Sequence, residues 1–136
     1  ADQGEHAFRV SIRPDADIAD AVREGYRINL PVRHVRGGAG AQPLVAVSSE
    51  AVVVEAVKLA EDRSGDVIVR VYEAQGGRAS AELTTAFDFD RVTETDLLER
   101  ETDQAAVDSS SSRAVRLSLR PFQLVTLRLH SPSLGA

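Results

Sequence analysis

The sequence predicts a mostly β protein: an antiparallel, immunoglobulin-like β-sandwich of about seven strands, preceded by a strand and a short helix. Three observations predict this fold class. Short segments alternate apolar and polar residues with the period of two that marks a half-buried strand. Turns rich in Gly, Ser and Asp separate these segments at near-regular spacing. No helix long enough for the crossover of a parallel sheet lies between them.

The first part of the chain contains one predicted strand and one predicted helix. In residues 6–13 (HAFRVSIR) apolar side chains alternate with polar ones, and Pro14 ends this strand. The next residues change to a helical period, with Asp15 as the expected N-cap and Gly25 as the expected C-terminal stop. We expect a helix of roughly two or three turns. Pro31 then makes the following segment an edge or a crossing.

A Gly-rich loop, residues 37–43, separates this part from the predicted sandwich. Within the sandwich, Ala79, Ala81 and Leu83 should share one face of their strand, because they stand two positions apart. The segment DSSSS, residues 108–112, is expected to be a polar turn. The predicted strands lie within residues 43–49, 51–62, 66–74, 78–90, 92–100, 113–120 and 122–130.

Composition narrows the class of protein. The chain has 136 residues, 43% of them hydrophobic, which suffices for one domain with a core or a core plus a smaller appendage. Aromatic residues make up 4% and there is no Trp, which argues against a surface that stacks sugars or bases. The net charge is −5 with both signs interspersed, so we expect neither nucleic acid nor a membrane as partner. The absence of Cys excludes disulfides and Cys-ligated zinc and fits a cytoplasmic location.

Two further features concern the origin of the chain. Lys58 is the only Lys among the basic side chains, which indicates a GC-rich and, we expect, bacterial source. The chain has no Met and opens on Ala1-Asp2-Gln3-Gly4, so we expect a piece of a longer polypeptide. No signal peptide and no apolar run of roughly 20 residues is present.

The segment KLAEDRSGDVIVRVYE is rich in carboxylates and is the first candidate site. Between two apolar strands, Asp62 to Asp66 fit a turn, because Asp and Ser satisfy turn backbone and Gly65 tolerates positive φ. Calcium binding is the alternative, with Glu73 at the twelfth position counted from Asp62. Because Ile68 occupies a ligand position of that pattern, the calcium motif fits poorly.

Glu61 and Glu73 are the candidate pair for glycosidase chemistry. Such carboxylates stand about 5 to 10 Å apart across a cleft, a separation that two neighbouring strands can supply. Lys58 and Arg70 lie on the same two strands, however, and are expected to pair with these acids across the sheet. We therefore favour charge neutralisation on a solvated sheet face.

The remaining polar groups fit no catalytic or metal-binding motif. Asp88 and Asp90 alternate with two Phe residues, so they are expected to be solvated acids opposite buried rings. Ser109 to Ser112 lack a nucleophile elbow, and the GGAG segment lacks the Lys of a P-loop. No two histidines have the spacing of zinc ligands on one element; they are His6, His34 and His130.

Three stretches, in this order, carry a family resemblance: residues 6–33, residues 52–79 (VVVEAVKLAEDRSGDVIVRVYEAQGGRA) and residues 119–129 (LRPFQLVTLRL). Together they resemble the C-terminal region of glycoside hydrolase family 38, the α-mannosidases, over roughly residues 6 to 130. Gln123 stands where the family often has Glu. The matching positions are Gly25-Tyr26 with Asn29-Leu30-Pro31, Lys58 with Glu61 and Asp62, Arg70 to Glu73, and Pro121-Phe122 with Thr126-Leu127.

The resemblance implies activity in the parent protein and none in this chain. Family members are zinc-dependent retaining exo-α-mannosidases whose metal ligands and nucleophilic Asp lie in an N-terminal α/β barrel. Those motifs have no counterpart here, so we expect no catalytic, cofactor-binding or metal-binding residue, and zinc is implied only for the missing catalytic domain. Lys58, Arg70 and Glu73 are candidates for interdomain or substrate-edge contacts.

The resemblance also implies a domain division and partners. Residues 1–36 would end a preceding large β-sandwich region, residues 37–43 form the loop, residues 44–130 the small C-terminal sandwich and residues 131–136 a tail. The expected partners are the missing N-terminal domains and, through the parent, mannosides. A strand cut from its sheet could also pair across a homodimer. The alternative is a stand-alone carbohydrate-binding or protein-docking sandwich.

Overall fold

The computed structural model describes residues 3–30, 32–34, 36–38, 40, 42–102 and 109–131. The chain divides into two compact units, residues 1–39 and residues 40–136. The predictions for Pro31 and for the tail beyond residue 131 fall outside the described residues.

The first unit contains helix α1, Ile18–Asn29. Its N-cap is Asp17 and not Asp15 as predicted, because the Asp17 carboxylate accepts the Asp20 backbone N–H at 2.7 Å, whereas Asp15 has a left-handed φ of 55°. Gly25 does not end the helix, which continues for 12 residues in all. Among the described residues, no helix has the length and apolar character needed to cross a bilayer.

The strand predicted for residues 6–13 is wrong. These residues belong to no ladder in the described chain, and their apolar side chains are almost fully exposed. A strand requires a hydrogen-bonded neighbour, and the described residues supply none for this segment. The alternating pattern is therefore present without the sheet that it indicates.

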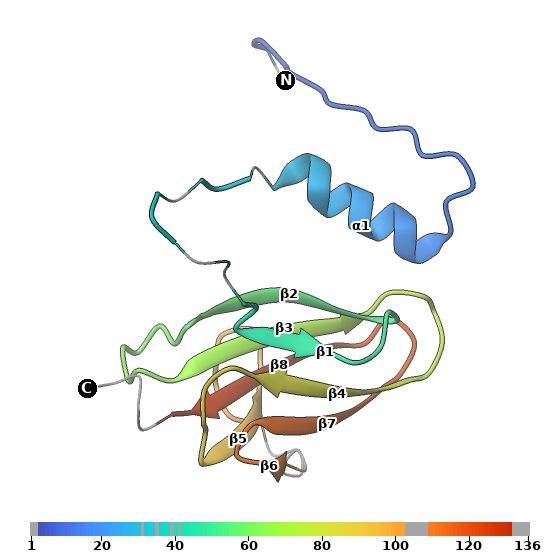
Figure 1. Ribbon diagram of the computed structural model, residues 1–136. Helices are drawn as coiled ribbons and strands as arrows, with labels where there is room; N and C mark the ends of the chain where they lie inside the picture. The colour runs from blue at the N-terminus through green and yellow to red at the C-terminus, as the bar shows by residue number, and fades with distance from the viewer. Residues whose placement is uncertain are drawn as a thin grey trace. The chain divides into compact units, whose positions relative to one another are not determined.

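The second unit is an antiparallel β-sandwich, as predicted (Figure 1). Two four-stranded sheets lie face to face, in the orders β1-β4-β7-β6 and β2-β3-β8-β5, and every ladder is antiparallel. The described residues form eight strands and not the seven expected. The strands are β1 Val45–Val47, β2 Val52–Leu59, β3 Val67–Glu73, β4 Ala79–Thr85, β5 Arg91–Thr95, β6 Ser109–Ser111, β7 Ala114–Leu119 and β8 Leu124–His130.

The core between the sheets consists of aliphatic side chains from both. Strand β4 is buried at every second residue, which confirms the predicted face of Ala79, Ala81 and Leu83. Strands β3 and β8 contribute valines and leucines at the centre of the second sheet, and Phe89 is the buried ring. The core cluster is therefore built from aliphatic side chains and the Phe87 and Phe89 rings, as the composition indicated.

Two segments differ from their predicted structure. The polar turn expected at residues 108–112 contains strand β6, which is the strand additional to the seven expected. Its residues Ser109–Ser111 pair with β7 at the sheet edge. A short edge strand needs little apolar surface, so its sequence resembles a turn. The strand expected over residues 92–100 ends at Thr95, because the Asp96 carboxylate accepts the backbone N–H groups of Leu98 and Arg100 and so forms a turn.

Candidate functional site

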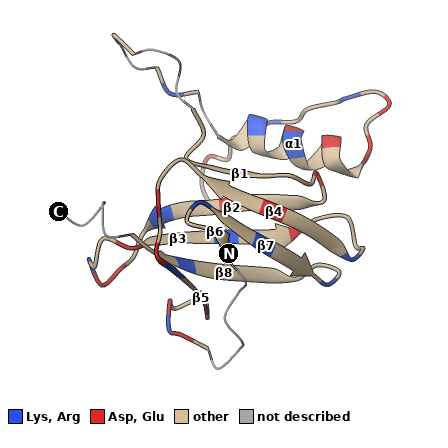
Figure 2. Cartoon of the chain, turned by 60° about the horizontal axis from the view of Figure 1, so that its bottom comes forward, with Lys and Arg blue, Asp and Glu red and all other residues tan. Residues whose placement is uncertain are grey.

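The three residues singled out from the sequence lie on the sheet β2-β3-β8-β5 of the second unit. Lys58 is on β2, and Arg70 and Glu73 are on β3. Figure 2 shows acidic and basic residues spread along strands, turns and helix, as the interspersed charges of the sequence indicate. The site is therefore built from small groups of paired charges and not from one charged surface.

Glu73 is a buried carboxylate, with only 1% of its surface exposed. It accepts the backbone N–H groups of Gln75 and Gly76, each at 2.8 Å, and that of Phe122 at 3.0 Å. The hydrogen bond from Phe122 holds the pKa of Glu73 below its ordinary value, more than burial raises it, and the amides of the 75–77 turn act in the same direction. Backbone amides therefore stabilise the charge of Glu73. Arg70 does not pair with it, although the sequence predicted this pairing.

The Glu73 carboxylate joins two turns that are distant in sequence. Gly76 has a φ of 79°, and a Cβ atom there would lie 2.8 Å from the ring of Phe122. Phe122 itself has a φ of 56°, which is rare for a bulky residue. Gln123 completes the second turn, since its side chain accepts the Arg120 backbone N–H at 2.9 Å. The carboxylate therefore acts as a clamp between the β3–β4 and β7–β8 turns.

The turn of residues 62–66 is a hairpin connection, as expected, and Arg128 from β8 holds it. The Arg128 guanidinium donates to Asp62 at 2.6 Å, to Asp66 at 2.7 Å and to Ser64 at 3.0 Å. Arg63 has a φ of 59° and takes a left-handed position beside Gly65. The pKa of Asp62 is lowered to about 2, chiefly by the hydrogen bond from Arg128 and then by Ser64.

Asp66 also contacts the histidine at the end of β8. The Asp66 carboxylate lies 3.0 Å from Nδ1 of His130, while the other ring nitrogen lies 3.4 Å from the Thr93 hydroxyl. Burial on its own would raise the pKa of Asp66, but the hydrogen bond from Arg128 and the charge of His130 together lower it. Both carboxylates of this turn are therefore engaged and ionised.

Lys58 is held by two acids. Its ammonium group lies 2.5 Å from Glu61 and 2.7 Å from Glu99, and the Glu61 backbone N–H donates to the second oxygen of Glu99 at 2.8 Å. Hydrogen bonds from Glu61 and then Glu99 raise the pKa of Lys58. Glu99 stands in the loop after β5, so this loop is fastened across the outer face of the sheet.

Arg70 lies on the same outer face, under that loop. Its guanidinium donates to the Thr126 hydroxyl at 3.3 Å and to the Leu97 carbonyl at 3.5 Å, and it lies 3.9 Å from Glu55. These are long contacts with neutral groups or a distant acid. Arg70 therefore supports the loop and does not neutralise Glu73.

Asp88 and Asp90 have the solvent-facing position expected of them. Asp88 forms a two-point ion pair with Arg113, at 2.8 and 2.9 Å, and this hydrogen bonding lowers its pKa. The rings beside them pack inward, with Phe89 buried and Phe87 partly buried against the core. The pair joins the segment after β4 to the turn before β7 on the solvent-facing side.

The described residues bring together no group of three or more His, Asp or Glu side chains that could hold a metal ion. His6 and His34 belong to the first unit, and His130 belongs to the second. The zinc implied by the family resemblance therefore has no ligand set in the part of the chain that the structure describes.

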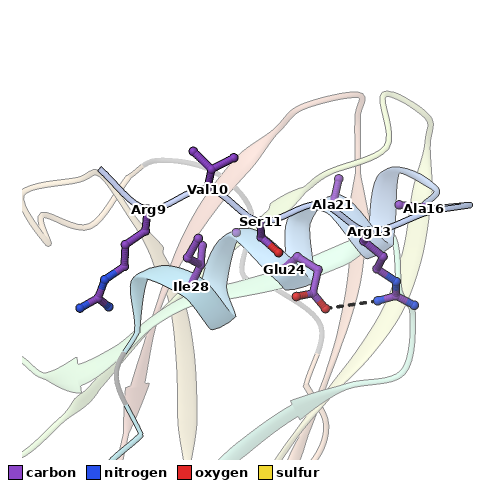
Figure 3. Close-up of a pocket in the computed structure, with 9 residues that line it drawn as sticks. Arg9, Val10, Ser11, Arg13, Ala16, Ala21, Glu24 and Ile28 are labelled. Carbon is purple, nitrogen blue, oxygen red and sulfur yellow. Dashed lines mark hydrogen bonds and ion pairs between the residues drawn. The ribbon is translucent and has the colours of Figure 1, made fainter. Parts of the chain in front are cut away.

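The first unit contains a hollow of about 450 Å³ between residues 9–16 and helix α1 (Figure 3). Apolar side chains such as Ile28 form part of its lining. Arg13 pairs with Glu24 at 3.4 Å and with Asp20 at 2.9 Å, so both carboxylates are engaged in ion pairs. Glu24, the acidic residue among the described lining residues, is therefore held in ion pairs.

A second, wide hollow of about 660 Å³ lies on the outer face of β4 and β7. Its lining mixes apolar residues such as Leu117 with polar ones, which include Ser80 and Glu82 from β4 and Arg116 and Ser118 from β7. Glu82 accepts a hydrogen bond from the Ser110 hydroxyl at 3.4 Å. Hydroxyl, guanidinium and carboxylate groups of this kind could hydrogen-bond a polyhydroxylated ligand.

Sequence reasoning missed two residues that organise the second sheet, Glu99 and Arg128. Arg128 stands two positions before His130, so period two places both on one face, a signal that could have been used. The contacts of Arg128 and His130 with Asp66 depend on the pairing of β3 with β8, which brings together residues about 60 positions apart. Glu99 carried no signal, because it lies in a loop.

Comparison with known proteins identifies the family. The family described as "Glycosyl hydrolases family 38 C-terminal beta sandwich domain" matches residues 51–127, more than half of the chain. Alpha-mannosidase 2C1 from Homo sapiens is 30% identical, and that from Mus musculus 29% identical, each over 95% of this chain and 13% of the relative. Alpha-mannosidase from Saccharomyces cerevisiae is 27% identical over 96% of this chain and 14% of the relative.

These matches confirm the resemblance drawn from the three sequence stretches. The chain spans only 13% or 14% of the length of these curated relatives. The matched residues run from the start of β2 into β8, so they cover most of the sandwich. The chain therefore belongs to the family of glycosyl hydrolase family 38 C-terminal β-sandwich domains.

Proposed function

We propose that this chain is the non-catalytic C-terminal β-sandwich domain of an α-mannosidase and that it supports the catalytic domain of the parent. One observation carries the proposal: alpha-mannosidases match the chain along nearly its whole length, while the chain covers only 13% or 14% of theirs. Most of such a parent, including a catalytic domain, would lie outside this chain. Hydrolysis of terminal α-mannosides is accordingly proposed for the parent.

The hydrogen bonds and ion pairs of the candidate carboxylates favour a non-catalytic role for this chain. A retaining glycosidase needs two carboxyl groups about 5 Å apart that face a substrate. Glu73 is buried and clamps two turns, while Glu61 pairs with Lys58. Glu73 is therefore hidden from a substrate, and Glu61, whose side chain is 83% exposed, already has an ion-pair partner.

Turnover of an aryl α-mannoside tests the proposal. We expect none above buffer from the 136-residue chain and turnover from the polypeptide encoded by the complete open reading frame. We propose that zinc is bound by the parent's missing catalytic domain, so a chelator should abolish that turnover while leaving the circular dichroism of this chain unchanged. Turnover by the chain alone, or none by the complete polypeptide, would contradict the proposal.

We also propose that Lys58 and Arg70 belong to an interdomain or substrate-edge contact in the parent. Both side chains keep some exposure on the outer face of their sheet, and both are positioned by the loop that carries Glu99. Glu73 would act indirectly, since it is buried but fixes the backbone of Phe122, whose side chain is 73% exposed. Lys58→Ala and Arg70→Ala in the complete polypeptide should raise the KM for mannosides or lower stability, with kcat little changed.

We also propose a domain division, a cellular location and a source for this chain. Residues 1–36 would end a large β-sandwich region of the parent, followed by the loop 37–43, the small sandwich 44–130 and the tail 131–136. The absence of Cys supports a cytoplasmic location, and the arginine-rich composition supports a GC-rich, bacterial source. Fractionation of cells that express the complete polypeptide tests the location.

A carbohydrate-binding function is the second candidate, favoured by the polar side chains in the hollow on β4 and β7. Its serine hydroxyls, Glu82 and Arg116 could bind a mannose oligomer. Titration calorimetry of the 136-residue chain with mannobiose tests it, with Arg116→Ala as the variant expected to weaken binding. The absence of heat from the unmodified chain would retire this candidate.

A further inference from the structure

Three polar side chains form a row across the outer face of the sheet β2-β3-β8-β5. Arg70 of β3 is directly opposed to Thr126 of β8, and Thr126 is directly opposed to Thr95 of β5. Directly opposed residues of an antiparallel pair point to the same face, with Cβ atoms about 4.5 to 5.5 Å apart. The chain neighbours of Thr126, which are Val125 and Leu127, belong to the core cluster, so the row points away from the core. Arg70, Thr126 and Thr95 are called here the outer polar row.

The two threonines of the row are buried although they face outward. Thr95 is 5% exposed and Thr126 is 2% exposed. The Arg70 guanidinium lies over Thr126, since it donates to the Thr126 hydroxyl at 3.3 Å and to the Leu97 carbonyl at 3.5 Å. Leu97 stands two positions after Thr95, so the guanidinium extends from β3 across β8 towards the end of β5. The Arg70 side chain keeps 22% exposure, which leaves solvent a path to the row.

Hydrogen-bond donors are in excess in the row. The Thr95 hydroxyl has no hydrogen-bond partner within the part of the chain that the structure describes. The Thr126 hydroxyl accepts from Arg70, and none of the described residues accepts its own proton. The Nη1 group of Arg70 likewise has no acceptor among them. Because buried polar groups are nearly always partnered, the Thr95 hydroxyl indicates a bound species at this position.

The nearest acidic side chain does not supply the acceptor. Glu55 lies 3.9 Å from Nε of Arg70, which is beyond hydrogen-bond distance, and its side chain is 41% exposed. Glu55 belongs to β2, on the other side of β3 from the two threonines. The row therefore has a positive charge and free donors on the side of β8 and β5.

We infer that the outer polar row binds a small anion of the size and charge of chloride. The ion accepts hydrogen bonds from the Thr95 hydroxyl, the Thr126 hydroxyl and the Arg70 guanidinium, and it donates none. A water molecule at the same position would bring two protons of its own that need acceptors. The guanidinium charge favours the anion further, because hydrogen bonds between charged groups are the stronger ones.

The burial of the row sets the size of the ion. Thr95 and Thr126 are almost closed to solvent, so a monatomic anion fits beside them and a bulky carboxylate does not. Because Arg70 also holds the Leu97 carbonyl, the bound ion fastens the loop after β5 to the sheet. The inference goes beyond the proposed function and does not require the catalytic domain of the parent.

The salt dependence of stability in the 136-residue chain tests the inference. An ion that binds only the folded chain shifts the folding equilibrium, by about tenfold when its concentration is ten times the dissociation constant. The urea midpoint should therefore rise more in sodium chloride than in sodium gluconate at the same ionic strength. Gluconate screens surface charges equally but is too bulky for the row. Equal rises in the two salts would overturn the inference.

Three variants separate the ion from the fold. Thr95→Val keeps the shape of the side chain without the hydroxyl, so it should abolish the chloride-dependent rise without lowering the midpoint in gluconate. Arg70→Gln should weaken the apparent affinity for chloride about tenfold. Thr93→Val is the matched control, because Thr93 lies two positions earlier on β5 and its hydroxyl contacts His130 at 3.4 Å. This control should keep the rise within about twofold, and a rise that survives Thr95→Val would overturn the inference.

Diffraction from the unmodified chain locates the ion independently of the variants. Bromide can replace chloride and is identified by its anomalous scattering, so crystals soaked in sodium bromide should show a peak in contact with Thr95, Thr126 and Arg70. Bromide found only elsewhere on the surface would be an adventitious ion only. That result, or a water molecule bound at the row in its place, would overturn the inference.

Discussion

Residues 7–13 and strand β4 have the same alternating pattern of apolar and polar side chains but different environments. In β4 the alternate inner residues are at most 8% exposed. In the first unit, Phe8, Val10 and Ile12 are 84% to 89% exposed. The two segments differ in their neighbours, since β4 pairs with β1 and β7, while residues 7–13 have no ladder in the described chain.

The comparison separates two kinds of information in a β sequence. The alternation of apolar and polar residues indicates which face of a segment can be buried. Pairing with neighbouring strands decides whether that face is buried. In the sandwich, pairing is reinforced at the turns, where Glu73 and Arg128 each hold segments that are distant in sequence. The following predictions test how much stability each kind of contribution provides.

The largest effect is expected from the core of β4. Leu83→Ala removes a fully buried side chain and should lower the free energy of unfolding by about 3 kcal/mol, because a cavity adds to the lost burial. Ile12→Ala should change it by less than about 0.5 kcal/mol. Urea unfolding followed by circular dichroism measures both.

A large cost for Ile12→Ala would break the comparison. It would mean that the segment 7–13 is packed in solution against a surface that the described residues do not show. Equal and small costs for both variants would instead deny that β4 is the centre of the core.

The next effect is expected from Glu73→Gln, with a cost below that of Leu83→Ala. The amide keeps one acceptor oxygen but directs an N–H group at the backbone amides of Gly76 or Phe122. Because the folded-state pKa of Glu73 is depressed, its stabilisation is complete above the ordinary pKa of 4.5 and is lost as pH falls below it.

The pH dependence distinguishes this clamp from ordinary packing. Between pH 6 and pH 2 the urea midpoint of the unmodified chain should fall, with contributions from Glu73 and from Asp62, whose pKa is about 2. The Glu73→Gln variant should show a smaller fall over the same range. Parallel pH profiles for the two proteins would mean that the carboxylate contributes nothing as an ion.

Much of the sandwich could be predicted from the sequence, because period two and turn residues are local signals. The inner faces of β4 and β7 follow from the spacing of Leu83 or Leu117 within their strands. The edge strand Ser109–Ser111 could not be predicted, since its only reason to be extended is its pairing with β7.

The candidate site was less predictable, because its contacts depend on strand register. The sequence placed Lys58, Arg70 and Glu73 on neighbouring strands, which is correct. It could not show that Glu73 accepts the backbone N–H of Phe122, 49 residues away, besides those of Gln75 and Gly76 in the adjacent turn. Backbone donors have no sequence signature, so a carboxylate of this kind looks like any other.

A smaller effect is expected from Gly76→Ala, which tests how much the turn between β3 and β4 contributes to stability. A Cβ atom would lie 2.8 Å from the Phe122 ring, and the φ of 79° strains any side chain at this position. We expect a cost of about 1 to 2 kcal/mol in the free energy of unfolding. Gly77→Ala is the matched control, since nothing lies within 4 Å of its Cβ position. If both substitutions change the free energy of unfolding equally, the cause would be the lower flexibility of the unfolded chain and not a clash with Phe122.

The smallest effect is expected from Arg128→Ala, which removes the guanidinium shared by Asp62 and Asp66. The side chain is largely buried, so these charge-assisted hydrogen bonds should contribute about 1 kcal/mol, more than an exposed ion pair. Arg113→Ala, which breaks the solvent-facing pair with Asp88, should leave the urea midpoint unchanged. The difference between these two variants should shrink as the pH falls from 6 towards 2, because Asp62, whose pKa is about 2, loses part of its charge. If the difference stays constant over that range, Arg128 stabilises the turn through packing of its aliphatic stem, and the pairing of β3 with β8 depends less on charge than the geometry indicates.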